Sequence, residues 1–170
     1  MTIGQRSKVK GQSKHALVLV AVLACAEYSQ PAQVEPPAVR PDGIVAYLIA
    51  SPSTAPNEYV VRAVSKRGVA VEDPASFLAT LRLSPRGVVY VSDLSDQGAL
   101  RVISASDTAL RIAGASPEGL ASGELFAVRL RAARAADLNA LHLEIGELND
   151  RSGISLRPTL VVLPHVAWVR

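Results

Sequence analysis

The sequence predicts an all-β protein, an antiparallel, jelly-roll-like β-sandwich of eight to nine strands. Several segments alternate strictly between apolar and polar residues, the pattern of strands with one buried and one solvated face. Turn-forming residues recur about every ten positions, a spacing typical of sandwiches and barrels. No segment shows the helix–strand alternation of an α/β protein. Apolar residues make up 49% of the chain but aromatic residues only 4%, so we expect an aliphatic core.

Strands are expected wherever β-branched and alternating segments lie between turn clusters. The expected strands are residues 43–51, 58–65, 76–84, 87–94, 98–104, 109–114, 124–132, 140–145 and 154–164. The alternation places Phe77 and Phe126 on the buried face, and Arg82, Arg129, Arg131 and His142 on the solvent side. Residues 131–140 are rich in Ala and Arg, and they are compatible with either a helix or a loop containing one helical turn.

Residues 1–24 have the order of a secretory signal peptide. Basic residues without acidic ones precede an apolar run at 16–23, which is too short for a membrane span of about 20 residues. Two cleavage sites compete. Val22-Leu23-Ala24-Cys25 resembles a bacterial lipobox, cut before a lipidated Cys25, whereas Ala24-Cys25-Ala26 is an ordinary signal-peptidase site that would discard the cysteine. Both predict an extracytoplasmic protein, periplasmic or secreted in the second case.

The only cysteine of the chain favours the lipobox, because a single thiol has no disulfide partner. Residues 25–41 then form a Pro-rich tether behind the lipidated cysteine, although a disordered N-terminus without that role has the same composition. Four of the 18 basic residues lie in the leader, which leaves 14 against 15 acidic residues. This balance argues against a nucleic-acid partner.

Three consecutive blocks resemble the cohesin domain family. They are "FLATLRLSPRGVVYVSDL", "LRIAGASPEGLASGELFAVRLRA" and "LHLEIGELNDRSGISL", and the resemblance covers residues 42–163. Ser84-Pro85 replaces the family's common Asp-Pro, and Pro74-Ala75-Ser76 stands where a glycine is common. The resemblance implies a sandwich fold shared with some carbohydrate-binding modules, no catalysis, and docking of a calcium-folded dockerin module on one sheet face. It transfers no binding residues. Residues 164–170 are expected to be a C-terminal tail.

Catalytic chemistry has little support in the sequence. After the leader the chain has two histidines, His142 on the solvent side of a strand and His165 near the end, and no Gly-x-Ser-x-Gly motif. We therefore expect neither an enzyme nor a cofactor.

Two acidic pairs, Asp93 with Asp96 and Glu147 with Asp150, lie in turn-like sequence, where Asp commonly accepts hydrogen bonds from its own backbone. Clustered turn oxygens also suit calcium, but neither pair has EF-hand spacing, so we predict no metal site.

The sequence leaves three classes of binding function open. The favoured one is a lipid-anchored module that docks a protein partner, with a calcium-dependent dockerin-like module as the candidate. The alternatives are a carbohydrate-binding module and a structural subunit of an envelope complex. Sugar binding would use exposed aromatic rings, and the candidates outside the tether and the buried face are Tyr47, Tyr59, Tyr90 and Trp168.

Overall fold

A computed structural model describes residues 38–83, 87–94, 100–120 and 123–169. Cys25, the expected signal peptide and most of the expected tether lie outside these residues. The described part of the chain belongs to one compact unit, residues 31–170. No helix among the described residues has the length and apolar character to cross a membrane.

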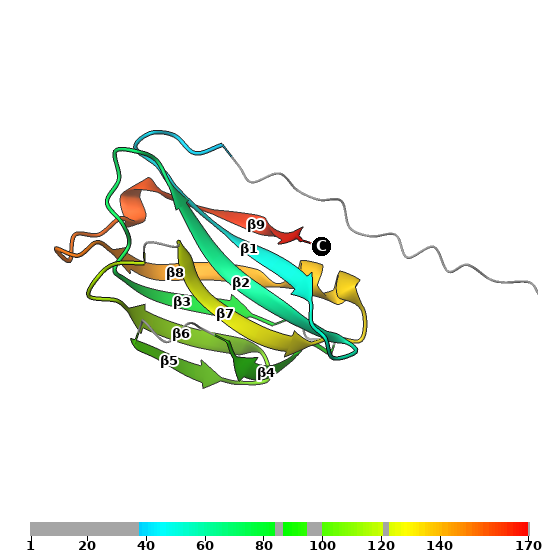
Figure 1. Ribbon diagram of the computed structural model, residues 1–170. Coiled ribbons are helices and arrows are strands. Elements are labelled where there is room, and N and C mark those ends of the chain that lie inside the picture. The colour runs from blue at the N-terminus through cyan, green and yellow to red at the C-terminus, as the bar shows by residue number, and fades with distance from the viewer. Residues whose placement is uncertain (1–37, 84–86, 95–99, 121–122, 170) are drawn as a thin grey trace, which may run out of the picture. The chain divides into compact units, whose positions relative to one another are not determined.

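Two packed β-sheets form the fold, as the sequence predicts (Figure 1). The five-stranded sheet has the order β4-β7-β2-β1-β9, and the four-stranded sheet has the order β5-β6-β3-β8. The nine strands of the described residues are β1 (Ile44–Pro52), β2 (Glu58–Arg67), β3 (Ser76–Arg82), β4 (Val89–Asp93), β5 (Leu100–Ala105), β6 (Ala109–Ala115), β7 (Glu124–Arg131), β8 (His142–Asn149) and β9 (Leu160–Trp168). All neighbouring strands are antiparallel except β1 and β9, which are parallel.

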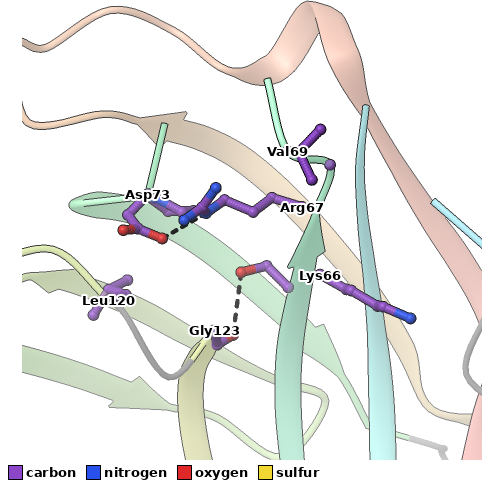
Figure 2. A pocket seen from close by; sticks show the side chains of 9 residues that line it. Lys66, Arg67, Val69, Asp73, Leu120 and Gly123 are labelled. Carbon is purple, nitrogen blue, oxygen red and sulfur yellow. Dashed lines mark hydrogen bonds and ion pairs between the residues drawn. The ribbon is translucent and has the colours of Figure 1, made fainter. Parts of the chain in front are cut away.

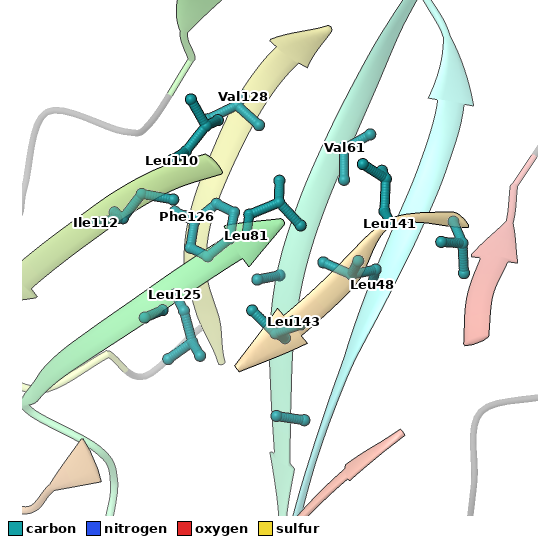
Figure 3. Packing of buried hydrophobic residues seen from close by; sticks show 14 of the residues in the cluster. Leu48, Val61, Leu81, Leu110, Ile112, Leu125, Phe126, Val128, Leu141 and Leu143 are labelled. Atoms are coloured by element: carbon teal, nitrogen blue, oxygen red, sulfur yellow. The ribbon is translucent and has the colours of Figure 1, made fainter. Parts of the chain in front are cut away.

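The core lies between the two sheets and is aliphatic, with one aromatic pair. Phe77 of β3 and Phe126 of β7 are both buried, and their ring centroids are 6.4 Å apart. Leucine, isoleucine and valine side chains from both sheets fill the rest of the core, and Figure 3 shows Leu81, Leu143 and Val61 among them. The alternation seen in the sequence therefore reports correctly which of the predicted side chains face inward on β3, β7 and β8.

The segment 131–140 contains a short helix. A 3₁₀ helix, η1, spans Ala135–Ala140, and Asp137 accepts hydrogen bonds from the backbone and the guanidinium of Arg134. Leu138 of η1 is fully buried. This is the second of the two alternatives left open by the sequence, a connection that carries a short helical segment.

The last strand differs from the prediction at both ends. It begins at Leu160, after a 3₁₀ helix η2 (Arg157–Thr159), and it continues to Trp168. A register shift against β1 accommodates Pro164, which an edge strand tolerates because its missing N–H leaves no ladder bond unmade. Val166 and Trp168 are buried and pair with Leu48 and Ala50. Residues 164–168 are thus part of the sandwich, and the expectation of a tail there is wrong.

Candidate functional site

The outer face of the four-stranded sheet carries several exposed apolar side chains. On β3, Phe77, Ala79 and Leu81 enter the core, so Leu78, Thr80 and Arg82 point outward. On β6, Leu110 and Ile112 enter the core. The alternate residues Arg111, Ala113 and Ala115 therefore point outward. We call this surface the β5-β6-β3-β8 face.

Strand register brings small and large apolar side chains together on one half of this face. Val102 on β5 is level with Ala113 on β6, and Ala113 is level with Leu78 on β3. Leu100 and Ala115 form the adjacent row. Leu78, Leu100 and Val102 are 42%, 79% and 70% exposed. We call Leu78, Leu100, Val102, Ala113 and Ala115 the apolar strip.

The other half of the face is charged. Arg82 donates two hydrogen bonds to Glu144 of β8, Nε to Oε1 at 2.7 Å and Nη2 to Oε2 at 3.2 Å. The hydrogen bond from Arg82, and then its positive charge, lower the pKa of the Glu144 carboxyl, although partial desolvation opposes them. His142 Nε2 lies 3.9 Å from Glu144 Oε1. This half is therefore held in place by a bidentate pair.

Two further charges on the face, Arg111 and Glu147, have no ion pair among the described residues. Arg111 on β6 is level with Thr80, and Glu147 on β8 is level with Leu78. They lie diagonally on either side of β3. An apolar strip bordered by unpaired charges is the composition of a protein-docking surface, with an apolar centre and a polar rim.

The outer face of the five-stranded sheet is different. Its outward residues Val45 and Tyr47 on β1 are buried. Glu58 of β2 lies between two arginines of β7, with Arg131 Nη2 at 2.8 Å and Arg129 Nε at 3.8 Å. The expectation that Arg131 is exposed is confirmed, whereas Arg129 is only half-exposed beside Glu58. This face offers little open apolar surface at its centre.

Two shallow hollows accompany the sheets. The first, of about 290 Å³, lies at the end of β2 between Lys66, Val69 and Leu120 (Figure 2). Arg67 Nε binds Asp73 Oδ1 there at 2.6 Å, so its cation is already neutralised. The second, of about 500 Å³, lies between the approach to β1 and the start of β9. Neither hollow contains a histidine, and neither shows a nucleophile beside a base.

The four aromatic candidates for sugar binding are spread over the molecule rather than gathered on a surface. Tyr47 and Trp168 are buried, and Tyr59 and Tyr90 are half-buried against the core. Trp168 packs edge-on against Tyr59 with centroids 5.9 Å apart, and its Nε1 donates to Asn139 at 3.2 Å. Burial raises the pKa of the Tyr90 hydroxyl, with a smaller contribution from Asp93. The structure gives these rings no open platform for stacking on a sugar.

Of the acidic candidates that the structure describes, only Asp150 behaves as a turn residue; Asp93 is the last residue of β4 and Glu147 lies within β8, so the expectation of turn positions is wrong for these two. Asp150 is buried, and its Oδ1 accepts hydrogen bonds from the backbone N–H groups of Ser152 and Ile154, both at 2.8 Å. Asp96 lies outside the described residues. Among the described residues no group of three or more metal-ligating side chains comes together.

Sequence reasoning did not identify the apolar strip. The signal was present at Leu78, a leucine at a position that the alternation of 76–84 assigns to solvent. The rest of the strip could not be recognised without knowing that β5 and β6 continue the same sheet beside β3.

The solved structures that superpose on this chain include several cohesins. A non-cellulosomal cohesin from the archaeon Archaeoglobus fulgidus superposes with a TM-score of 0.56 at 17% identity, covering 74% of this chain and 89% of that one. The sixth cohesin of scaffoldin B from Acetivibrio cellulolyticus, solved with a Cel5 dockerin mutant, gives a TM-score of 0.51 at 12% identity, covering 74% and 97%. A type I cohesin from Clostridium thermocellum, also solved with a dockerin, gives 0.50 at 11% identity, covering 75% and 99%.

No family model matches the sequence, and no curated protein matches it. The evidence from comparison therefore comes from three-dimensional structure, and at these identities it concerns the fold. Strand order, the two-sheet architecture and these superpositions agree with the resemblance seen in the sequence. The chain has the β-sandwich fold of cohesin domains.

Proposed function

We propose that this protein is a non-catalytic, extracytoplasmic docking module that binds a protein partner on its β5-β6-β3-β8 face. The observation that carries the proposal is the apolar strip. Leu100 and Val102 are, after Val69, the most exposed large apolar side chains among the described residues, and the 42% exposed Leu78 lies on the same sheet face. An open apolar patch bordered by charges is typical of surfaces that a partner covers.

The partner that we propose is a dockerin-like module. Two of the similar solved structures are cohesins crystallised with dockerins, which supports a protein partner over a small molecule for this fold. The shallow hollows of the present structure support the same choice, because small-molecule sites are generally deeper and more enclosed. Dockerins of the cohesin-binding kind fold around calcium, so we expect binding to require calcium.

We further propose that Cys25 carries a lipid that holds the module at a membrane. The supporting observations are the order of the leader, the lone cysteine and the Pro-rich residues that follow it. In this arrangement the Pro-rich tether acts as a spacer between the membrane and the sandwich, and the docking face of the sandwich is accessible to the partner.

The test is a capture experiment that uses residues 31–170, the compact unit that contains the whole described core, as bait. Envelope and secreted fractions of the native organism are passed over the wild-type domain and over Leu78→Lys and Val102→Lys variants. Val69→Lys is the matched control, because Val69 is 92% exposed but lies at the end of β2, away from the strip.

The expected result is a partner that the wild-type and Val69→Lys domains retain, that both strip variants lose, and that a calcium chelator releases. Retention by the strip variants would place the docking surface elsewhere. Retention in the chelator would exclude a calcium-dependent dockerin and favour a structural subunit of an envelope complex. Circular dichroism of each variant verifies that its fold is intact.

A further inference from the structure

Among the described residues of the β5-β6-β3-β8 face, the unpaired cation Arg111 and the unpaired anion Glu147 lie on opposite sides of β3. Arg111 and Glu147 are separated by two strand spacings and one register step. At about 4.8 Å per strand and about 6.7 Å per two residues, their backbones are about 12 Å apart, and neither side chain forms an ion pair with the other or with another described residue. Each charge therefore lacks its complement on its own face.

Two copies of the face supply those complements to each other. The midpoint between Arg111 and Glu147 falls on β3, between Leu78 and Thr80. A two-fold axis lying in the plane of the face through this midpoint brings Arg111 of one copy onto Glu147 of the other, and the reverse. Such a symmetric contact needs a self-complementary patch, and this arrangement of opposite charges is one.

The same rotation buries the apolar strip. Leu78 lies next to the axis, so it meets the Leu78 region of the second copy. Ala113 and Ala115 beside it have small side chains, which allow the two sheets to approach closely. The paired Arg82 and Glu144 lie toward the rim, where their charges stay hydrated.

We propose that a second copy of this chain covers the β5-β6-β3-β8 face, forming a two-fold dimer with two reciprocal Arg111–Glu147 ion pairs. Four strands by four rows give a flat area of about 500 Å² on each copy. This is small for a stable interface, so the dimer is weak and dissociates on dilution. If the proposed docking function holds, a protein partner and the second copy compete for one face, and local concentration on the membrane regulates docking.

The test is sedimentation velocity of residues 31–170 over a wide concentration range, with no other protein present. The wild-type domain is expected to shift from monomer to dimer as concentration rises. Arg111→Glu and Glu147→Arg each place like charges in both reciprocal contacts, so each is expected to weaken dimerisation by about tenfold or more. Arg157→Glu, an exposed arginine of η2 away from this face, is the matched control and should leave dimerisation unchanged.

Charge complementation makes the test specific. The double variant Arg111→Glu/Glu147→Arg restores both ion pairs and is expected to dimerise within about threefold of wild type. An equimolar mixture of the two single variants is expected to form a heterodimer more readily than either variant forms a homodimer. Leu78→Asp is expected to abolish every form of the dimer.

A domain that stays monomeric at all concentrations overturns the proposal, and so does a dimer that ignores these substitutions or a double variant no better than the single ones. The outcome is independent of the docking function, because the experiment contains only this chain. A monomer that still captures a protein through the strip would overturn the dimer and leave the docking function standing.

Discussion

Gly114 of β6 faces the core at a position that has no room for a side chain. A methyl group at its Cβ position would lie 2.3 Å from Cε1 of Phe77, whose ring is buried and packed against Phe126. Gly114→Ala is therefore expected to destabilise the domain by about 1–3 kcal/mol, the cost of overpacking a filled core. Urea denaturation followed by circular dichroism measures the change.

Gly146→Ala on β8 is the matched control. Its added methyl group would meet no atom closer than 3.5 Å, so it is expected to leave the free energy of unfolding nearly unchanged or to raise it slightly. Equal effects of the two substitutions would show that the Phe77 ring moves freely, contrary to the packing described.

The Arg82–Glu144 pair makes a prediction about pH. Because Arg82 lowers the pKa of Glu144 in the folded state, Glu144 contributes stability that is present above its unfolded pKa and is lost as pH falls through its folded pKa. Arg82→Met removes the hydrogen bonds, and the Glu144 pKa is expected to rise toward its ordinary value. Carboxyl-carbon NMR titration measures it directly.

Both side chains of this pair are substantially exposed, so the predicted change concerns the titration rather than overall stability. Arg157→Met, away from the pair, is the control and should leave the Glu144 titration unchanged. An unaltered titration in Arg82→Met would mean that the pair does not persist in solution.

At the scale of elements, β9 closes the edge of the five-stranded sheet beside β1. Trp168, at the end of β9, packs edge-on against Tyr59, and its Nε1 donates a hydrogen bond to Asn139 of η1. It therefore joins the sheet to the connection that contains η1. Trp168→Ala is expected to cost about 3–5 kcal/mol, the range for removing a buried aromatic side chain. Chemical denaturation monitored by far-ultraviolet circular dichroism measures the loss.

His165→Ala is the control for the same strand, because His165 is exposed and its removal is expected to change stability by less than about 0.5 kcal/mol. A small effect of Trp168→Ala would indicate that the end of β9 is not firmly packed, as a C-terminal tail would be.

The same strand shows where sequence reasoning failed. Alternation identified β3, β7 and β8 because each buries the apolar residues that recur at every second position. The exposed pair Pro164-His165 interrupts β9, and Val166 and Trp168 regain their burial only through a register shift against β1. Neither the shift nor the parallel partner strand has a local signature, because both are set by a strand more than a hundred residues earlier in the chain.

At the scale of the whole molecule, the candidate docking face depends on strand order. The residues of the apolar strip come from β3, β5 and β6, and their adjacency follows from the order β5-β6-β3-β8. The sequence supported two sheets and the inward residues, but it could not rank one sheet face above the other. That choice needed the exposure of Leu100 and Val102 on the edge strand and the burial of Val45 and Tyr47 on the opposite face.

The proposed lipid on Cys25 would set where such a face can act. Residues 26–41 contain four prolines, and an extended chain of that length at about 3 Å per residue would reach about 50 Å from a lipid on Cys25. A docking face held at that distance would be accessible to a partner outside the membrane, and tethering would raise the concentration of each copy near its neighbours.

The anchor itself is tested in full-length chain expressed in a bacterium that processes lipoproteins. Cleavage at the lipobox is expected to give a membrane-bound product that begins at Cys25 and incorporates labelled fatty acid. Cys25→Ala leaves Ala24 and Ala26 in place for ordinary signal peptidase, so this variant is expected to lose the label and to appear in the soluble fraction. Ser29→Ala, in the same segment, is the control that should keep both label and membrane attachment. An unlabelled wild-type product whose mass corresponds to a start at Glu27 would show that the cysteine is discarded with the leader and that the domain works untethered.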